Sequence, residues 1–401
     1  MKKRILIAAY YLEIGGAESS LIGMLQAFDY SKVAVDLFLY SHQGAFMNLI
    51  PKEVHLLDEI PEYTFICKEA TACFKFGYWK IGFAKLLVRL CLGIYSKLKR
   101  PKTYSAWFTF TGAILTHVLP DFGRQEGYDL AISFVAPHNF ILDHVKATRK
   151  VGWIHTDYST IDVYQGLESY AWRRLDHPIS ISSAVTEAFV RVFPNEKEKI
   201  VEIENILSPS FVRRRAAEFV PKEYAPSRES GEVVLCTAGR LCIPKNYQNF
   251  PYMLRRLVDL GCKFHWYVIG PGNPEEYLLK ARDFGVEDKI SFLGGKTNPY
   301  PYIANCDLYV QPSLWEGKSV AVREAQILKR PVVITNFGTA SSQVLDGVDG
   351  IIVPIDNEKI AEGVFALAQN AHQQRAIVEY LSAHDYGNEK EIKKIYALID
   401  E

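Results

Sequence analysis

The chain has 401 residues, of which 48% are hydrophobic and 23% charged, and its 46 basic residues equal its 46 acidic ones in number. This composition is that of a globular protein with ample core material and excludes a disordered chain. The charge balance also removes the overall positive field that would attract nucleic acid. At roughly 150 residues per domain, we expect two or three domains.

The seven cysteines predict neither a disulfide framework nor a zinc site. Their number is odd, no pair has Cys-x-x-Cys spacing, and none lies in a short run with histidine, so we expect a reducing, cytoplasmic environment. The basic N-terminus with its short apolar run at 5–9 is interpreted as a buried strand, not as a signal peptide. No apolar run reaches the roughly 18 residues that a membrane span needs.

Short runs rich in Val, Ile and Leu alternate with amphipathic helical patterns along the chain. Near-continuous apolar runs are typical of parallel strands that are buried on both faces, and helices between them make βαβ units. The predicted strands are 5–9, 33–40, 130–135, 151–154, 179–182, 233–238, 263–269, 290–293, 307–311, 331–334 and 350–353. Predicted helices include 17–27, 184–192, 248–260 and 320–328. We therefore expect an α/β protein with two doubly wound parallel sheets.

The boundary between the two domains is predicted at residues 208–231. This stretch holds several prolines and an Arg-Arg-Arg run, and the strand pattern restarts directly after it. Residues 1–207 and 208–375 are expected to form one Rossmann-like domain each, and the polar segment after them reads as helix.

Residues 75–102 depart from the general pattern, because they contain eight Lys or Arg residues and no Asp or Glu among many apolar residues. Wound as a helix, Lys85, Arg89 and Lys97 form a narrow basic stripe beside a wide apolar face. That pattern is typical of a helix lying in the interface of an anionic membrane. A core helix with a solvated basic edge is the alternative, and the sequence leaves both open.

The loop after the first predicted strand reads Ile14-Gly15-Gly16-Ala17-Glu18 and leads into a helix. Glycine allows the backbone to approach a ligand closely, and a helix N-terminus favours an anion. By themselves such glycines more often only make a turn. The spacing differs from Gly-x-Gly-x-x-Gly, which argues against a dinucleotide site.

A second loop places two cations after a buried strand: Arg240 follows the strand 233–238 almost directly, and Lys245 comes five residues later. At the carboxyl end of a parallel sheet they can neutralise a diphosphate and stabilise the charge that develops on it as a leaving group. Plain surface charge is the alternative for two cations alone.

The most specific pattern is the run 312–325, which reads Pro-Ser-Leu-Trp-Glu-Gly-Lys-Ser-Val-Ala-Val-Arg-Glu-Ala. Glu316 lies in the loop after strand 307–311, and Gly317 permits a tight turn. The segment 318–320 offers backbone N–H groups at a helix start. Glu324 lies about one turn into that helix and faces back toward the loop. Two carboxylates at this spacing can hold different hydroxyls of one ligand, although helix surface charge is the alternative for Glu324.

In this order and spacing, the Gly-Gly loop, the Gly-Arg-x4-Lys element and the Glu-x7-Glu element resemble glycosyltransferase family 4. Further similar stretches are 181–186, 203–206 and Gly270-Pro271-Gly272. The resemblance covers residues 151–353 well and 5–25 adequately, and it is poor across about 46–122. Ile206 stands where the family often has Gly, and Lys318 where it often has Phe.

The resemblance implies a GT-B fold, in which two Rossmann-like domains face each other across a cleft. Residues 1–207 would bind the acceptor and 208–375 the nucleotide-sugar, while a helix at about 376–401 packs back on the first domain. The implied activity is that of a retaining hexosyltransferase, which moves a sugar from a nucleotide-diphosphate-sugar to a hydroxyl of a glycan or lipid-linked saccharide. A UDP-sugar is expected ahead of a GDP-sugar. No metal and no cofactor is expected, since the chain contains no Asp-x-Asp.

The resemblance also assigns roles to residues of this chain. Arg240 and Lys245 would bind the donor diphosphate, and Glu324 would hold the ribose hydroxyls. Glu316 would contact the transferred sugar, and His155, directly after strand 151–154, matches the family histidine near that sugar; a structural role is the alternative for a lone histidine. The catalytic set is thus Glu316, His155, Arg240 and Lys245. The donor-binding set is Gly15, Gly16, Arg240, Lys245, Gly270, Gly317, Lys318, Ser319, Val320 and Glu324.

The implied setting is the assembly of a bacterial surface polysaccharide, such as capsule or O-antigen, by a cytoplasmic enzyme. Contact of the segment Lys75–Lys102 with the inner face of the membrane would make it a peripheral membrane protein. Three alternatives share the fold: a nucleotide-sugar epimerase, a sugar phosphorylase and a non-catalytic sugar-nucleotide-binding protein.

Overall fold

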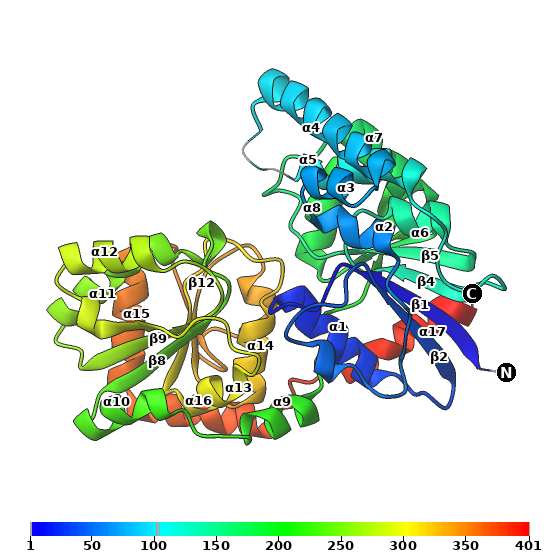
Figure 1. Cartoon of the computed structure of the whole chain (residues 1–401). Coiled ribbons are helices and arrows are strands. Elements are labelled where there is room, and N and C mark those ends of the chain that lie inside the picture. Colours follow the sequence, from blue (N-terminus) through cyan, green and yellow to red (C-terminus); the bar gives the residue numbers. More distant parts are fainter. Residues whose placement is uncertain (1, 102, 104, 401) are drawn as a thin grey trace. The chain divides into compact units, whose positions relative to one another are not determined.

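A computed structural model describes residues 2–101, 103 and 105–400, and the chain divides into two units (Figure 1). Among the described residues, unit 1 comprises 2–13, 21–205 and 390–400. Unit 2 comprises Ile14–Ser20 and Ile206–Glu389. Each unit is built around one parallel sheet, and the two are described in turn.

Unit 1 contains a seven-stranded parallel sheet in the order β3-β2-β1-β4-β5-β6-β7. Its strands are β1 (Lys3–Ala9), β2 (Val33–Leu39), β3 (His55–Leu56), β4 (Tyr128–Ser133), β5 (Ala147–Ile154), β6 (His177–Ser180) and β7 (Val201–Glu202). In the sheet centre, Ile5 of β1 lies opposite Val35 on one side and Leu130 on the other. Such apolar residues are buried on both faces of the sheet, which explains the near-continuous apolar runs.

Eight helices lie between those strands or after them in unit 1, and a ninth, α17, comes from the end of the described chain. They are α1 (Gly16–Ala27), α2 (Pro61–Thr64), α3 (Ala70–Lys75), α4 (Trp79–Lys99), α5 (Ala106–Leu115), α6 (Asn139–His144), α7 (Gln165–Arg174), α8 (Ser183–Val192) and α17 (Ile392–Asp400). Short 3-10 turns cover Met47–Leu49, Phe65–Cys67, Thr116–Val118 and Pro194–Lys199. The first turn of α1 groups with unit 2 and the rest of the helix with unit 1.

Unit 2 contains a six-stranded parallel sheet in the order β10-β9-β8-β11-β12-β13. Its strands are β8 (Val233–Ala238), β9 (Phe264–Ile269), β10 (Ile290–Phe292), β11 (Leu308–Gln311), β12 (Val332–Thr335) and β13 (Ile351–Val353). Its helices are α9 (Pro209–Ala216), α10 (Ala225–Ser230), α11 (Phe250–Asp259), α12 (Glu275–Asp283), α13 (Tyr300–Asn305), α14 (Val320–Ile327), α15 (Asn357–Gln369) and α16 (Ala371–Ala383). Short 3-10 turns cover Lys222–Tyr224, Ile243–Lys245, Tyr247–Asn249, Glu287–Lys289 and Ala340–Ser342, and a further turn, Glu389–Glu391, spans the passage back to unit 1.

Both sheets are doubly wound, which confirms the predicted fold class. In each, the chain begins at a central strand, builds outward to one edge and then returns to build the other half. The order therefore reverses between β1 and β4 in unit 1, and between β8 and β11 in unit 2. Ligands of open α/β sheets bind at such a reversal, beyond the carboxyl ends of the strands. The reversal in unit 2 lies next to Arg240, which follows β8, and Glu316, which follows β11.

The local sequence accounts for these elements. In α11, Phe250, Met253, Leu254 and Leu257 recur at helical spacing and are fully buried, which fixes the face that packs on the sheet. All eleven predicted strands overlap observed ones. The two strands that the sequence did not predict, β3 and β7, are two residues long and form the edges of the sheet. Two residues show no periodicity, so the pattern could not reveal them.

The division between the units differs in detail from the prediction. The chain passes from unit 1 to unit 2 between Asn205 and Ile206. The supposed connecting stretch 208–231 is largely helical, because Ser208 caps α9, Pro209 occupies its first turn, and α10 follows. The return of the chain end to unit 1 is shorter than the predicted 376–401: α16 stays in unit 2, and only the part from residue 390 onward groups with unit 1.

The basic segment 75–102 forms α4, and its cations are not arranged as predicted. Lys85 turns inward, where its ammonium group donates to the carbonyls of Phe65 at 2.9 Å and Ile66 at 2.8 Å. Arg89 pairs with Glu69. The prediction of a continuous stripe of free cations at Lys85, Arg89 and Lys97 is therefore wrong, because Lys85 and Arg89 make contacts within unit 1. Lys102 lies outside the described residues. In the part of the chain that the structure describes, no helix has the length and apolar character that crossing a bilayer requires.

Candidate active site

Two loops of unit 2 meet at the carboxyl edge of the sheet, where the strand order reverses. The loop after β8 carries Arg240 and Lys245, and the loop after β11 carries Glu316. A backbone hydrogen bond of 2.8 Å from the Leu314 N–H to the Pro244 carbonyl joins them. Because the two loops follow adjacent strands at the reversal of the strand order, the two motifs that the sequence singled out lie together at one edge of the sheet.

Lys245 and Glu316 form the centre of this site. The Lys245 Nζ lies 2.5 Å from Glu316 Oε1, and both side chains are largely buried, with 18% and 13% of their surface exposed. The same carboxylate oxygen accepts from Ser313 Oγ at 2.6 Å and from Gln311 Nε2 at 3.2 Å. Three donors therefore hold Glu316 in one orientation, and the two charges act as a pair.

Arg240 lies at the surface of unit 2, close to the glycine loop. A β-carbon placed on Gly15 would meet the carboxylate of Glu18 first and would lie 3.5 Å from Arg240 Nη2, while one on Gly16 would lie at an ordinary contact distance of 3.9 Å from a methyl group of Val320. Gly15 and Gly16 precede β2 in sequence, yet they group with unit 2. At Gly15 a side chain would displace Glu18 and narrow the space beside the Arg240 guanidinium, whereas Gly16 has room for a β-carbon.

The start of α14 is arranged differently from the prediction. The Ser319 N–H is not free: it donates to Gln343 Oε1 at 3.1 Å, and the Gln343 amide donates back to the Ser319 carbonyl. Among the described residues, the buried Ser319 hydroxyl has no hydrogen-bond partner. Gly317 and Lys318 complete the loop between Glu316 and this helix. The first turn of a helix, here beginning at Val320, carries N–H groups without intrahelical partners and so still favours an anion.

Glu324 is buried within unit 2, with 5% of its surface exposed. Its carboxylate accepts from Ser19 Oγ at 3.3 Å and from the hydroxyl of Tyr300. Burial disfavours the charged form and raises the pKa of Glu324 to about 7, against the lowering effect of the two hydroxyl donors. The carboxyl group therefore changes charge near neutral pH.

Gly270 lies beneath the arginine loop. A β-carbon on Gly270 would lie 1.9 Å from the carbonyl oxygen of Gly239, the residue that precedes Arg240. Only glycine permits this close approach of the loops after β8 and β9. The resemblance put Gly270 in the donor-binding set, and the geometry places it where it positions the backbone of Arg240.

His155 is the only predicted site residue that lies in unit 1. It follows β5, and its ring lies 4.7 Å from the ring of Phe134. Its Nε2 is buried and has no hydrogen-bond partner in the described residues. Burial lowers the pKa of His155 to about 4, so its imidazole is neutral at pH 7. A neutral imidazole can accept or donate one hydrogen bond through that nitrogen.

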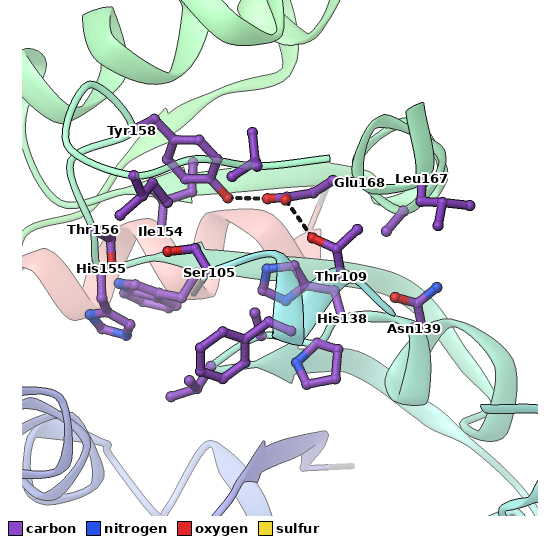
Figure 2. A pocket seen from close by; sticks show the side chains of 18 residues that line it. Ser105, Thr109, His138, Asn139, Ile154, His155, Thr156, Tyr158, Leu167 and Glu168 are labelled. Carbon is purple, nitrogen blue, oxygen red and sulfur yellow. Dashed lines mark hydrogen bonds between the residues drawn. The ribbon is translucent and has the colours of Figure 1, made fainter. Parts of the chain in front are cut away.

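A cavity of about 150 Å³ in unit 1 extends from His155 to α7 (Figure 2). Glu168 lies on the wall away from His155 and accepts from Tyr158 OH at 2.5 Å, Thr109 Oγ1 at 2.9 Å and Trp172 Nε1 at 3.3 Å. Burial raises the pKa of Glu168. His138 also lines the cavity, and burial lowers its pKa to about 3. The cavity is therefore apolar, with a few buried polar groups held in fixed orientations.

Sequence reasoning missed the residues that hold the predicted ones. In unit 2 these are Ser19, Tyr300, Gln311, Ser313 and Gln343, and in unit 1 they are Thr109, His138, Tyr158 and Glu168. Gln311 and Ser313 adjoin the Glu316 motif, so their polar character at the end of a buried strand was a usable signal. The remaining partners come from distant elements and carry no local pattern.

Residues 232–370 match the family model described as glycosyl transferases group 1, so unit 2 carries a domain of that kind. The N-acetylgalactosamine-N,N'-diacetylbacillosaminyl-diphospho-undecaprenol 4-alpha-N-acetylgalactosaminyltransferase of Campylobacter jejuni is 28% identical over 126 residues, which are 31% of this chain and 34% of that protein. The lipopolysaccharide core biosynthesis mannosyltransferase LpsB of Rhizobium meliloti is 34% identical over 110 residues, 25% of this chain and 31% of that protein. The chain thus spans about a third of the length of these curated relatives.

The structure of HepE from Anabaena, solved in complex with UDP and glucose, covers 98% of this chain and 98% of its own with a TM-score of 0.68 and 15% identity. That likeness extends over both units and concerns the fold alone. It confirms the predicted GT-B architecture of two Rossmann-like α/β domains.

Proposed function

We propose that this protein is a retaining glycosyltransferase that moves a sugar from a nucleotide-diphosphate-sugar to a hydroxyl of a glycan acceptor. One observation carries the proposal: Arg240, Lys245, Glu316 and the start of α14 converge at the strand-order reversal of unit 2. That arrangement offers two cations and a helix N-terminus to a diphosphate, and carboxylates to hydroxyl groups. The match of residues 232–370 to glycosyl transferases group 1 supports it.

The proposed mechanism depends on charge that develops during the reaction. When the bond between the anomeric carbon and the diphosphate breaks, negative charge grows on the leaving phosphate. Arg240 and Lys245 would stabilise that charge more in the transition state than in the bound donor, which lowers the barrier. Glu316 would orient the sugar. The departing phosphate would itself help to deprotonate the acceptor hydroxyl on the same face, so the configuration at the anomeric carbon would be retained.

The pairing of Lys245 with Glu316 adds a condition to this mechanism. The ammonium group lies 2.5 Å from the carboxylate, so a phosphate oxygen would have to share Lys245 with Glu316 or replace it. Ser313 and Gln311 would continue to hold the carboxylate when Lys245 turns to the phosphate. Donor binding would thereby leave Glu316 as an acceptor for the hydroxyls of the transferred sugar.

His155 and its cavity supply the part of the proposal that lies in unit 1. Because the His155 imidazole is neutral at pH 7 and its Nε2 lacks a partner among the described residues, it would form a hydrogen bond with a sugar hydroxyl without adding charge. We place the transferred sugar or the acceptor at this nitrogen. The remaining wall of the cavity is mostly apolar and would suit the faces of sugar rings.

We propose UDP-sugar as the donor, a saccharide carried on a lipid diphosphate as the acceptor, and surface-polysaccharide assembly at the cytoplasmic side of the membrane as the setting. The Campylobacter relative is named for an acceptor linked to diphospho-undecaprenol, and the Anabaena structure holds UDP. The reaction is proposed to need no metal. Because the matched proteins are named transferases, the epimerase, phosphorylase and non-catalytic alternatives are not favoured.

Titration calorimetry with a matched ligand series tests the donor site. We would compare UDP with UMP, with and without EDTA, in the wild type, in Arg240→Ala and in Arg255→Ala, which removes a half-buried arginine on α11 that pairs with Asp259. The expected result is tighter binding of UDP than of UMP, unaffected by EDTA. In Arg240→Ala, this preference should fall by about tenfold or more, since charge-assisted bonds to phosphate contribute roughly 1.5–3 kcal/mol each. Arg255→Ala should bind both nucleotides as the wild type does.

Two results would count against the proposal. Equal affinity for UDP and UMP would contradict the assignment of a diphosphate site to Arg240 and Lys245. Binding of UDP that disappears with EDTA would show that a metal ion, and not the two side chains alone, neutralises the diphosphate. Incubation with UDP-glucose, UDP-N-acetylglucosamine and UDP-galactose, followed by detection of released UDP, would then separate a transferase from a protein that only binds the nucleotide.

A further inference from the structure

Helix α4 lies at the periphery of unit 1 (Figure 1). Many of its large apolar side chains are exposed to solvent. Of the 20 large apolar side chains that are exposed in the described residues, eight fall between Phe76 and Leu98. We call these eight the α4 apolar face: Phe76, which caps the end of α3, and Trp79, Phe83, Leu86, Leu87, Leu90, Ile94 and Leu98 of α4, with exposures from 44% to 76%. A contiguous exposed apolar surface of this kind marks a site of interaction with a protein or a membrane.

This face is not the one by which the helix joins its own core. Ile81, Ala84 and Val88 are buried, and they recur at helical spacing on the inner side of α4. Trp79, Phe83 and Leu90 follow one another on the other side, at steps of four and seven residues. At 100° per residue the two sets point in nearly opposite directions. The helix is therefore apolar on two sides, and packing of unit 1 explains only the inner one.

Cationic residues flank the α4 apolar face at both ends. Lys75 and Lys80 are exposed near the first turn of the helix, and Lys97, Lys99 and Arg100 are exposed near the last. Between residues 75 and 102 the sequence contains no Asp or Glu. Apolar side chains flanked by cations match the interface of an anionic bilayer, where the apolar groups enter the acyl region and the cations meet phosphate groups.

A second copy of this chain fits the same surface less well. Two copies that met through this face, in either direction, would bring cationic ends together with no acidic residue of the segment between them. The cations of the two copies would repel each other. An anionic lipid surface would instead attract the same cations. We infer that the α4 apolar face inserts into the interface of an anionic membrane and holds unit 1 there.

The structure also predicts how this binding responds to salt. Lys85 donates to backbone carbonyls and Arg89 pairs with Glu69, so fewer cations reach the lipid than the sequence suggested. Binding should therefore depend on apolar insertion first and on charge second. Raising the salt concentration from about 0.1 M to 0.5 M should weaken binding without abolishing it, because salt screens only the electrostatic part.

Flotation of the full-length protein with lipid vesicles tests the inference. We would use phosphatidylcholine vesicles with and without about 30% phosphatidylglycerol, in the absence of any sugar substrate. The test variant is the double substitution Leu90→Glu and Ile94→Glu, in the middle of the face. The control is Leu279→Glu on α12, an equally exposed leucine in unit 2. Trp79 reports insertion through a blue shift of its fluorescence, and Trp79→Phe identifies that signal.

The wild type and Leu279→Glu should float with the anionic vesicles, and the double variant should partition at least about tenfold less, because two charges would enter the apolar layer. The double variant should keep the circular dichroism and melting temperature of the wild type, since both leucine and isoleucine are exposed. Lys97→Glu together with Lys99→Glu should weaken binding to anionic vesicles and leave weak binding to neutral ones unchanged.

Three results would overturn the inference: no flotation of the wild type with anionic vesicles, equal flotation of the wild type and the double variant, or a dimer in solution that the double variant disrupts. The inference rests on the proposed function only for its purpose, which is access to a lipid-linked acceptor. Binding of UDP to the double variant separates the two ideas. If UDP binds while flotation fails, the membrane inference falls alone; if flotation holds while UDP does not bind, the proposed function falls alone.

Discussion

Glu324 offers the sharpest test of the electrostatics of unit 2, through the substitution Glu324→Gln. Burial raises the pKa of this carboxyl from 4.5 to about 7 in the folded protein. The unfolded chain loses that proton near pH 4.5, so between the two values the folded state holds a proton that the unfolded state has lost. Stability therefore falls as the pH rises through this window. Glutamine keeps the shape of the side chain and cannot titrate.

The size of the effect follows from the two pKa values. Integrating the proton uptake between pH 5 and pH 8 gives a loss of about 2.5 kcal/mol in the wild type that the variant does not share. Below pH 5 the two proteins should differ mainly by the hydrogen bonds to Ser19 and Tyr300, which glutamine can accept through its carbonyl oxygen. Relative to the wild type, Glu324→Gln should thus gain stability as the pH rises.

Denaturant unfolding of both proteins at pH 5 and pH 8 measures this difference. Other titrating groups cancel, because the two proteins are compared at the same pH. The expected change in the free energy difference between them is about 2.5 kcal/mol. A change below about 0.5 kcal/mol would refute the reasoning, since Glu324 would then titrate as an exposed carboxyl does. The matched control is Glu287→Gln, because Glu287 is an exposed residue of the Glu287–Lys289 turn.

Three further predictions concern other residues of the site. Lys245→Met leaves the carboxylate of Glu316 without its cationic partner and should destabilise the protein by about 1–3 kcal/mol in denaturant unfolding. Adding Glu316→Gln should recover part of that loss. Additive losses in the double variant would show that the 2.5 Å pair is not coupled. Gly270→Ala should cost about 2 kcal/mol or more and weaken UDP binding, because its β-carbon would meet the Gly239 carbonyl, whereas Gly338→Ala, with open space around it, should change neither. The ring protons of His155 should show no titration by NMR between pH 5 and pH 8, and an apparent pKa near 6.5 would contradict the burial of its Nε2.

The sheets could be predicted from the sequence because their central strands are buried on both faces. Val234, Leu235 and Cys236 of β8 form an apolar run whose burial is complete, and the same holds for most strands that were predicted. The edge strand β3 lacks that signal, since His55 is exposed and the strand has two residues. What the pattern could not supply is strand order, which depends on pairing between distant segments.

The candidate site was predictable where chemistry and spacing coincide on one loop, and not where distant elements meet. Glu316 and Arg240 each follow a buried strand, so their place at the sheet edge follows from topology. The contact between Lys245 and Glu316 does not, because it depends on the adjacency of β8 and β11. Gln343, whose side-chain oxygen accepts the hydrogen bond from the Ser319 N–H, comes from a loop after β12 that carries no motif.

Helix α4 shows why charge counting in a sequence needs the structure. The sequence shows that the segment is basic and amphipathic, and it leaves a core helix and a membrane helix as alternatives. In the structure one apolar side of the helix packs inward at Val88, while the other stays exposed at Leu90. It also removes Lys85 and Arg89 from the free charge. Because Lys85 and Arg89 make contacts within unit 1, we expect the proposed membrane binding to depend mainly on the exposed apolar residues of the helix. Its affinity should then respond more strongly to Leu90→Glu with Ile94→Glu than to reversal of the charges at Lys97 and Lys99.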